Sequence, residues 1–217
     1  MLRVLRRRHV LALCLAAFVI VFPCSAAFAQ IRQVVVGLTP YCSEGLAGCW
    51  QTASNALPCL DGVKSTATSP DTYNCTVSVF LKEPKLPEVD AWTAELRAAV
   101  GGIYTFRGVE VTADGTVEER QEGLVLVIPG ITTPLPLATL QHKLQWNFRA
   151  RSAREPEPHE ARAFADLRAK LADANGATLH VQVTGPLHGI AESSTLEVRE
   201  WFSNGEDHAV STTTESK

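Results

Sequence analysis

The chain has 217 residues, with 20 basic and 23 acidic side chains, a formal net charge of −3 and 46% hydrophobic residues. This length suits one large domain or two small ones. The acidic balance argues against a nucleic-acid partner, because most of the affinity for nucleic acid comes from basic side chains that neutralise phosphates.

The N-terminus has the order of a secretory signal peptide, predicted for residues 1–29. A basic start, an uncharged run over residues 10–22 and the small-x-small pattern Ala27-Phe28-Ala29 follow one another. We therefore expect cleavage before Gln30 and an exported protein, periplasmic or extracellular. An uncleaved anchor is the alternative, but the run is shorter than the roughly 18 apolar residues that span a bilayer. Cleavage removes Arg3, Arg6, Arg7 and Arg8, so the mature chain has 16 basic and 23 acidic residues and a net charge of −7. No second long apolar segment follows, so we expect that the mature chain does not span a membrane.

Residues 30–107 carry alternating strand and helix patterns. Strands are predicted at residues 31–38, 63–68, 76–81 and 103–111, with helices from Cys49 to Leu60 and from Pro87 to Val100. Glycines follow both helices and predict their ends. The order β-α-β-β-α-β in so short a span predicts a ferredoxin-like sandwich, an antiparallel sheet with two helices on one face.

Residues 108–203 have a different order. Three strand patterns, at 109–118, 124–128 and 143–149, precede a helix containing Ala161, Phe164, Leu167 and Leu171, and strands at 178–184 and 195–201 follow. Three strands, one helix and two strands predict a small OB-like β-barrel. The fold class is therefore α+β with two domains, although one continuous domain is the alternative. Residues 204–217 hold almost nothing apolar and are predicted to be disordered.

The first helix resembles that of the heavy-metal-associated (HMA) domain family, whose modules carry copper or zinc in metallochaperones and transport ATPases. Gly37-Leu38-Thr39 stands where the family has Gly-Met-Thr. After Cys49, the family's apolar and glycine positions are occupied by Ala53, Ala56, Leu57, Leu60, Gly62 and Val63. The resemblance covers residues 31–107 and implies a ferredoxin-like domain that binds a soft metal ion. The chain departs from the family where the metal is held, because Leu46 stands three residues before Cys49 and the two-cysteine motif is absent.

Four cysteines remain in the predicted mature chain: Cys42, Cys49, Cys59 and Cys75. Cys49 starts a helix, where the helix dipole favours a thiolate, and Cys42 is its nearest possible partner. These two are the candidate metal ligands, for copper or zinc, although a disulfide between them is the alternative in an oxidising compartment. Cys75 is a possible third ligand or disulfide partner. Cys59 lies roughly 15 Å along the helix from Cys49, too far to share its site.

No other pattern points to a reaction. The sequence contains no Gly-x-Ser-x-Gly, phosphate loop, His-Glu-x-x-His or Cys-x-x-Cys. The five histidines of the mature chain are not spaced as a ligand pair, so each is expected to be a surface or packing residue: His142, His159, His180, His188 and His208. The sequence thus favours a non-enzymatic, exported metal-binding or metal-homeostasis protein. One alternative is an envelope module with structural disulfides that docks a protein or glycan, and another is a thiol redox enzyme using Cys42 and Cys49.

Overall fold

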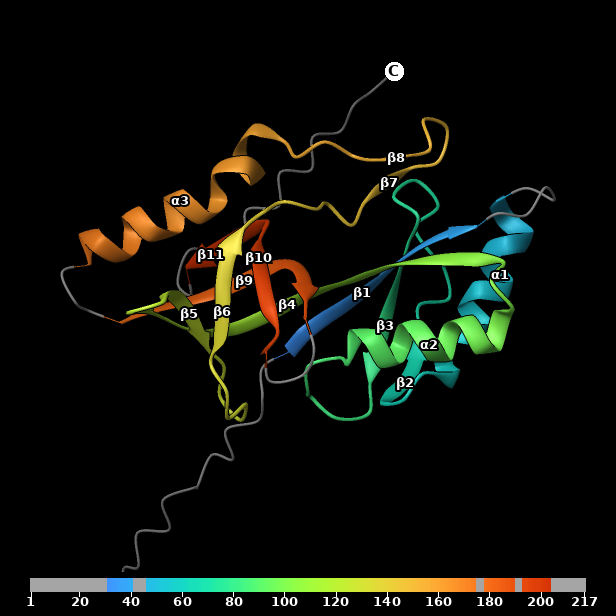
Figure 1. Cartoon of the computed structure of the whole chain (residues 1–217), viewed down its shortest axis with the longest axis horizontal. Coiled ribbons are helices and arrows are strands. Elements are labelled where there is room, and N and C mark those ends of the chain that lie inside the picture. The colour runs from blue at the N-terminus through green and yellow to red at the C-terminus, as the bar shows by residue number, and fades with distance from the viewer. Residues whose placement is uncertain (1–30, 41–45, 175–177, 190–192, 204–217) are drawn as a thin grey trace, which may run out of the picture.

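A computed structural model describes residues 31–40, 46–174, 178–189 and 193–203. The predicted signal peptide, the predicted disordered tail and Cys42 therefore lie outside the described residues. Strands dominate, and nine of them form one sheet in the order β11-β9-β10-β6-β5-β4-β1-β3-β2. Figure 1 shows the sheet running across the molecule, with α1 and α2 at one end and α3 at the other.

The N-terminal half has the element order that the sequence predicts. The elements are β1 (Ile31–Pro40), α1 (Leu46–Ala56), the short 3-10 helix η1 (Leu57–Cys59), β2 (Val63–Thr66), β3 (Thr76–Leu81) and α2 (Val89–Val100). The strands lie antiparallel in the order β4-β1-β3-β2. In α2, Trp92, Leu96 and Val100 recur at four-residue spacing and are buried. The helix ends at Gly101, whose φ of 62° is in the left-handed region that favours glycine.

The C-terminal half is a closed five-stranded barrel of OB-like order. It contains β4 (Tyr104–Arg120), β5 (Gly123–Val127), β6 (Leu135–Thr139), α3 (Pro158–Asp173), β9 (Leu179–His188) and β10 (Thr195–Val198). The barrel order is β4-β5-β6-β10-β9, and β9 pairs back onto β4 to close it. The strands β6 and β10 are parallel, and α3 lies between the third and fourth barrel strands along the chain. These features fit the predicted OB-like barrel.

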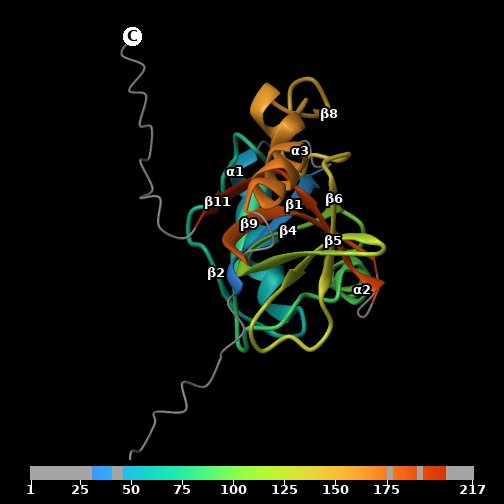
Figure 2. The ribbon, with the colours of Figure 1, turned by 90° about the vertical axis from the view of Figure 1, so that its left-hand side faces the viewer.

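Three short strands complete the structure. The strand β11 (Glu200–Ser203) follows β10 after Arg199 and pairs with β9. The strands β7 (Trp146–Asn147) and β8 (Ser152–Ala153) form a separate hairpin between β6 and α3. This hairpin reaches the periphery of the molecule in both Figure 1 and Figure 2.

The long strand β4 belongs to both halves. It has 17 residues, and β1 pairs with its first part, Tyr104 to Ala113, while β5 pairs with its end, Thr116 to Arg120. The predicted domain boundary between residues 107 and 108 therefore falls inside one strand. Buried apolar residues of both halves also belong to one core cluster. The division into two modules stays a prediction, but the modules would share a strand.

The third barrel strand was predicted at the wrong residues. It is β6, Leu135–Thr139, and the predicted strand at 143–149 contains only the two residues of β7. Pro134 precedes this strand and Pro136 lies in it, and prolines are more typical of loops and turns than of strands. Proline is tolerated at the beginning of a strand, and Pro136 is the second residue of β6. Among the described residues, no helix has the length and apolar character to cross a membrane.

Candidate metal centre

The predicted cysteine pair cannot be followed in the structure, because Cys42 and the Cys49 side chain lie outside the described part. The other two cysteines are free thiols, Cys59 exposed and Cys75 buried, so no disulfide joins them. The Cys75 sulfur lies 3.8 Å from the carbonyl oxygen of Thr72. Burial raises the pKa of the Cys75 thiol, although the nearby Arg107 guanidinium acts in the opposite direction. A buried, protonated thiol is a poor metal ligand.

A different set of metal-ligating side chains comes together in the barrel. His142, His188 and Glu197 each offer one ligand atom, and these three atoms lie within 4.8 Å of one another. Within the described ranges, no other group of three histidine, cysteine or acidic side chains meets this condition. Two imidazoles and one carboxylate are a common ligand set for zinc at three-ligand sites.

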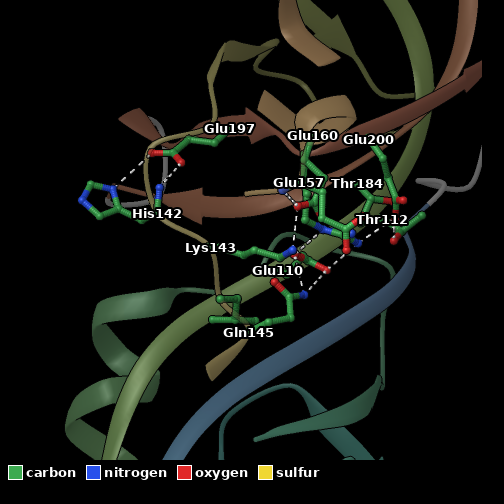
Figure 3. A network of polar contacts seen from close by, with 12 residues as sticks. Glu110, Thr112, His142, Lys143, Gln145, Glu157, Glu160, Thr184, Glu197 and Glu200 are labelled. Carbon is green, nitrogen blue, oxygen red and sulfur yellow. Dashed lines mark hydrogen bonds and ion pairs between the residues drawn. The ribbon is translucent and has the colours of Figure 1, made fainter. Parts of the chain in front are cut away.

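The barrel topology brings these residues together from three segments. His188 ends β9 and lies opposite Thr195 in the antiparallel pairing of β9 with β10. Glu197, two residues after Thr195, therefore lies on the same face as His188, as its diagonal neighbour. The strand β6 runs parallel to β10 on the other side, with Ala138 opposite Glu197, and His142 follows shortly after β6 ends. Figure 3 shows His142 turned toward the Glu197 carboxylate.

The distances at Glu197 match those between neighbouring ligands of a zinc ion. His142 Nδ1 lies 3.5 Å and His188 Nε2 lies 3.3 Å from Glu197 Oε1. Metal bonds of 2.0–2.2 Å in a tetrahedral site put neighbouring ligand atoms about 3.3–3.6 Å apart. The two imidazole rings are edge-to-face, with centroids 5.8 Å apart. The two imidazole nitrogens lie within 4.8 Å of each other.

The carboxylate is fixed in place by the backbone. Glu197 Oε2 accepts hydrogen bonds from the amides of Gln141 (2.6 Å) and His142 (3.0 Å). This arrangement leaves Oε1 directed toward the two imidazoles and corresponds to the outer-shell contacts that orient metal ligands. The Glu197 side chain is 8% exposed, whereas His142 is 78% and His188 is 46% exposed. The site thus has an anchored, buried carboxylate and an open side toward solvent.

A buried ionic network lies beside this site, around Arg199. Both Glu110 carboxylate oxygens accept hydrogen bonds from Arg199, from Nε at 2.9 Å and from Nη2 at 3.1 Å. Arg199 also donates to Glu160 (3.2 Å) and Glu200 (2.6 Å), and Lys143 Nζ donates to Glu160 at 2.6 Å. Figure 3 shows these side chains in one connected group. Three carboxylates and two cations share this layer between the barrel and α3.

Mutual contacts shift the pKa values of two members of this network, Glu160 and Arg199. Burial alone would raise the pKa of Glu160, but hydrogen bonds from Lys143, the Glu157 amide and Arg199 outweigh it, so the pKa is lowered. Burial alone would lower the pKa of Arg199, but Glu110 and Glu200 raise it instead. Every acid in the network has a cationic partner, which indicates a structural role.

Sequence patterns did not bring His142 and His188 together, because these residues come from separate segments. The expectation that both are surface or packing residues agrees with their exposure but misses the carboxylate that they share. His208 lies outside the described residues. One signal was present. In a hairpin, residues that lie diagonally opposite share a face, and the β9–β10 pairing places His188 and Glu197 in this relation. His142 depends on β6, the strand that the sequence placed wrongly.

Comparisons with protein-family models, with curated proteins and with solved structures found no match. The resemblance to the heavy-metal-associated family is therefore neither supported nor contradicted.

Proposed function

We propose that this protein binds a divalent transition-metal ion of the zinc type through His142, His188 and Glu197. The observation that carries the proposal is the pair of imidazole nitrogens 3.3 and 3.5 Å from one oxygen of a buried, backbone-anchored carboxylate. Nitrogen and oxygen ligands suit zinc, copper(II) or nickel(II), and not the soft copper(I) that thiolates prefer.

The proposal keeps the predicted class of function and changes the site and the preferred metal. An exported, non-enzymatic metal-binding protein of the periplasm or extracellular space remains the interpretation of the whole chain. The ferredoxin-like character of the N-terminal half belongs to the same proposal, and the strand order β4-β1-β3-β2 supports it. A soft-metal site at Cys42 and Cys49 remains a separate prediction.

The three protein ligands leave a coordination position on the solvent side. With both imidazoles neutral, one carboxylate and a divalent ion leave a net charge of +1 at the site. Structural zinc sites have four protein ligands, whereas a three-ligand site keeps an exchangeable position. This favours a metal that is taken up and released over one that is permanently buried.

A zinc titration of the purified protein against a chromophoric chelator tests the proposal. We expect one site, weakened at least about tenfold by His142→Ala, His188→Ala or Glu197→Gln, since even outer-shell changes cost about 10–100-fold. The control is His159→Ala, because His159 is exposed on α3 and faces only Glu157 in the described part. The proposal fails if the three ligand variants bind zinc as tightly as the wild type. Loss in a Cys42→Ser/Cys49→Ser variant alone would instead assign the metal to the thiols.

A further inference from the structure

The hairpin of β7 and β8 carries an unusual concentration of arginine. Its turn contains Arg149 and Arg151, both exposed, and Arg154 directly follows β8. Arg107 from β4 lies beneath the hairpin, with its guanidinium carbon 5.3 Å from the centroid of the Trp146 ring. Four cations thus gather at one end of a chain whose net charge is −3.

None of these four arginines forms an ion pair with a carboxylate in the part of the chain that the structure describes. Arg97 and Arg162 share this property but lie on separate helices, whereas four other arginines are paired with acids: Arg32, Arg120, Arg168 and Arg199. Asp71, in the same loop as Tyr73, accepts hydrogen bonds from the Tyr73 and Asn74 amides and the Asn74 side chain. Glu155 follows Arg154 and is exposed.

Aromatic rings support this positive surface. Arg154 stacks on the Tyr73 ring, with 3.8 Å from guanidinium carbon to ring centroid, and donates to the Tyr73 hydroxyl and carbonyl oxygens at 3.0 Å. Tyr73 itself is 71% exposed. The Trp146 amide donates to the Asn74 carbonyl oxygen, which fastens the hairpin to the Tyr73 loop. Stacking holds the guanidinium plane still. Its Nε is buried, so an anion can reach it only through the second N–H groups of Nη1 and Nη2.

We propose that the hairpin tip, with Arg149, Arg151 and Arg154 beside Tyr73, binds the surface of a membrane rich in anionic phospholipids. Arginine next to the exposed Tyr73 suits a lipid headgroup layer, where tyrosine rings, with a polar end and an apolar face, accumulate. The peripheral position of the hairpin is the second argument.

The shape of the hairpin favours a flat lipid surface over a soluble polyanion. The paired residues end at Asn147 and Ser152, and residues 148–151 form a compact turn at the tip. Exposed charges that lie farther from a surface than the Debye length, about 8 Å at physiological salt, are largely screened from it. A membrane can therefore meet the tip while the acidic remainder of the chain stays largely screened. A flexible polyanion would wrap further and meet the acidic surface.

Vesicle sedimentation with the full purified protein tests this proposal. We expect preference for phosphatidylcholine vesicles containing phosphatidylglycerol over pure phosphatidylcholine by about a hundredfold at physiological salt, since each arginine near an anionic surface contributes about fivefold. An Arg149→Gln/Arg151→Gln variant should lose about 25-fold of this preference. The matched control is Arg97→Gln/Arg162→Gln, which removes equal charge from exposed positions on α2 and α3. This control should stay within about twofold of the wild type.

Several results would overturn the proposal. Equal binding to both vesicle types would show that charge does not drive the interaction, and equal losses in the two variants would show that the tip is not the site. Binding to dextran sulfate without binding to anionic vesicles would assign the surface to a soluble polyanion. The metal ligands are untouched in every variant, so these outcomes do not depend on the proposed function.

Discussion

Replacing Arg199 with methionine should destabilise the protein strongly, because it removes the cation that two buried acids share. Glu110 is only 5% exposed, and its remaining partner is the Gln145 amide, 3.3 Å from Oε2. Glu160 retains Lys143, and Glu200 is 30% exposed, so water can reach it. Most of the lost stability should therefore come from Glu110, whose buried charge is left without a cationic partner. Removing one partner of a buried ion pair costs about 3–5 kcal/mol, and we expect that loss in the free energy of unfolding.

Urea unfolding followed by tryptophan fluorescence measures this loss. A Glu110→Gln/Arg199→Met double variant removes the stranded charge as well, so it should be more stable than Arg199→Met alone. Arg168→Met is the control, because Arg168 and Glu119 are 64% and 58% exposed and such pairs contribute less than about 1 kcal/mol. The reasoning is refuted if Arg199→Met costs less than about 1 kcal/mol, or if the double variant is no more stable than the single one.

Three further predictions concern single residues. Folding lowers the pKa of Glu160 below its ordinary value of 4.5, so its contribution to stability is full above that pH and is lost as the pH falls through the folded-state pKa. The urea midpoint should therefore fall more steeply with acid in the wild type than in Glu160→Gln, and parallel curves would contradict this. Gly185→Ala places a Cβ 1.6 Å from the Glu197 carbonyl oxygen and should cost about 3 kcal/mol or more in urea unfolding, whereas a loss under about 1 kcal/mol would show that β9 and β10 separate easily. With Cys42 and Cys49 changed to serine, a chromogenic disulfide reagent should label Cys59 rapidly and the buried Cys75 only on unfolding; equal native rates would be inconsistent with the observed burial.

Sequence patterns predicted the elements correctly where the spacing of nearby apolar residues determines the secondary structure. The alternating residues 76–81 predict β3 with the bounds observed, and the spacing of Trp92, Leu96 and Val100 predicts the buried face of α2. The element order after residue 108 predicted an OB-like barrel, although one of its strands was misplaced. Such patterns repeat every two or four residues, so they can be read from a short window.

Longer-range features could not be obtained in this way. Nothing local shows that β4 continues unbroken from Tyr104 to Arg120, because its continuity depends on β1 and β5 pairing with successive parts of it. The same holds for Glu110, which a strand pattern would place at a solvent-facing position. It is buried because Arg199 and Gln145 cover it. Contacts between segments distant in the sequence determine both the length of β4 and the burial of Glu110, and composition does not.

The metal centre and the ionic network depend on the same two stretches of backbone. Glu197 lies in β10 and Arg199 directly follows that strand, so the two are two residues apart; Glu197 contacts the histidines and Arg199 contacts Glu110. The second stretch contains His142 and Lys143. The backbone amide of His142 donates a hydrogen bond to Glu197, and the side chain of Lys143 donates one to Glu160. A shift of either stretch changes both sites at once. Substitutions in the network should therefore alter metal affinity, and their effects should not add to those of substitutions in the metal ligands.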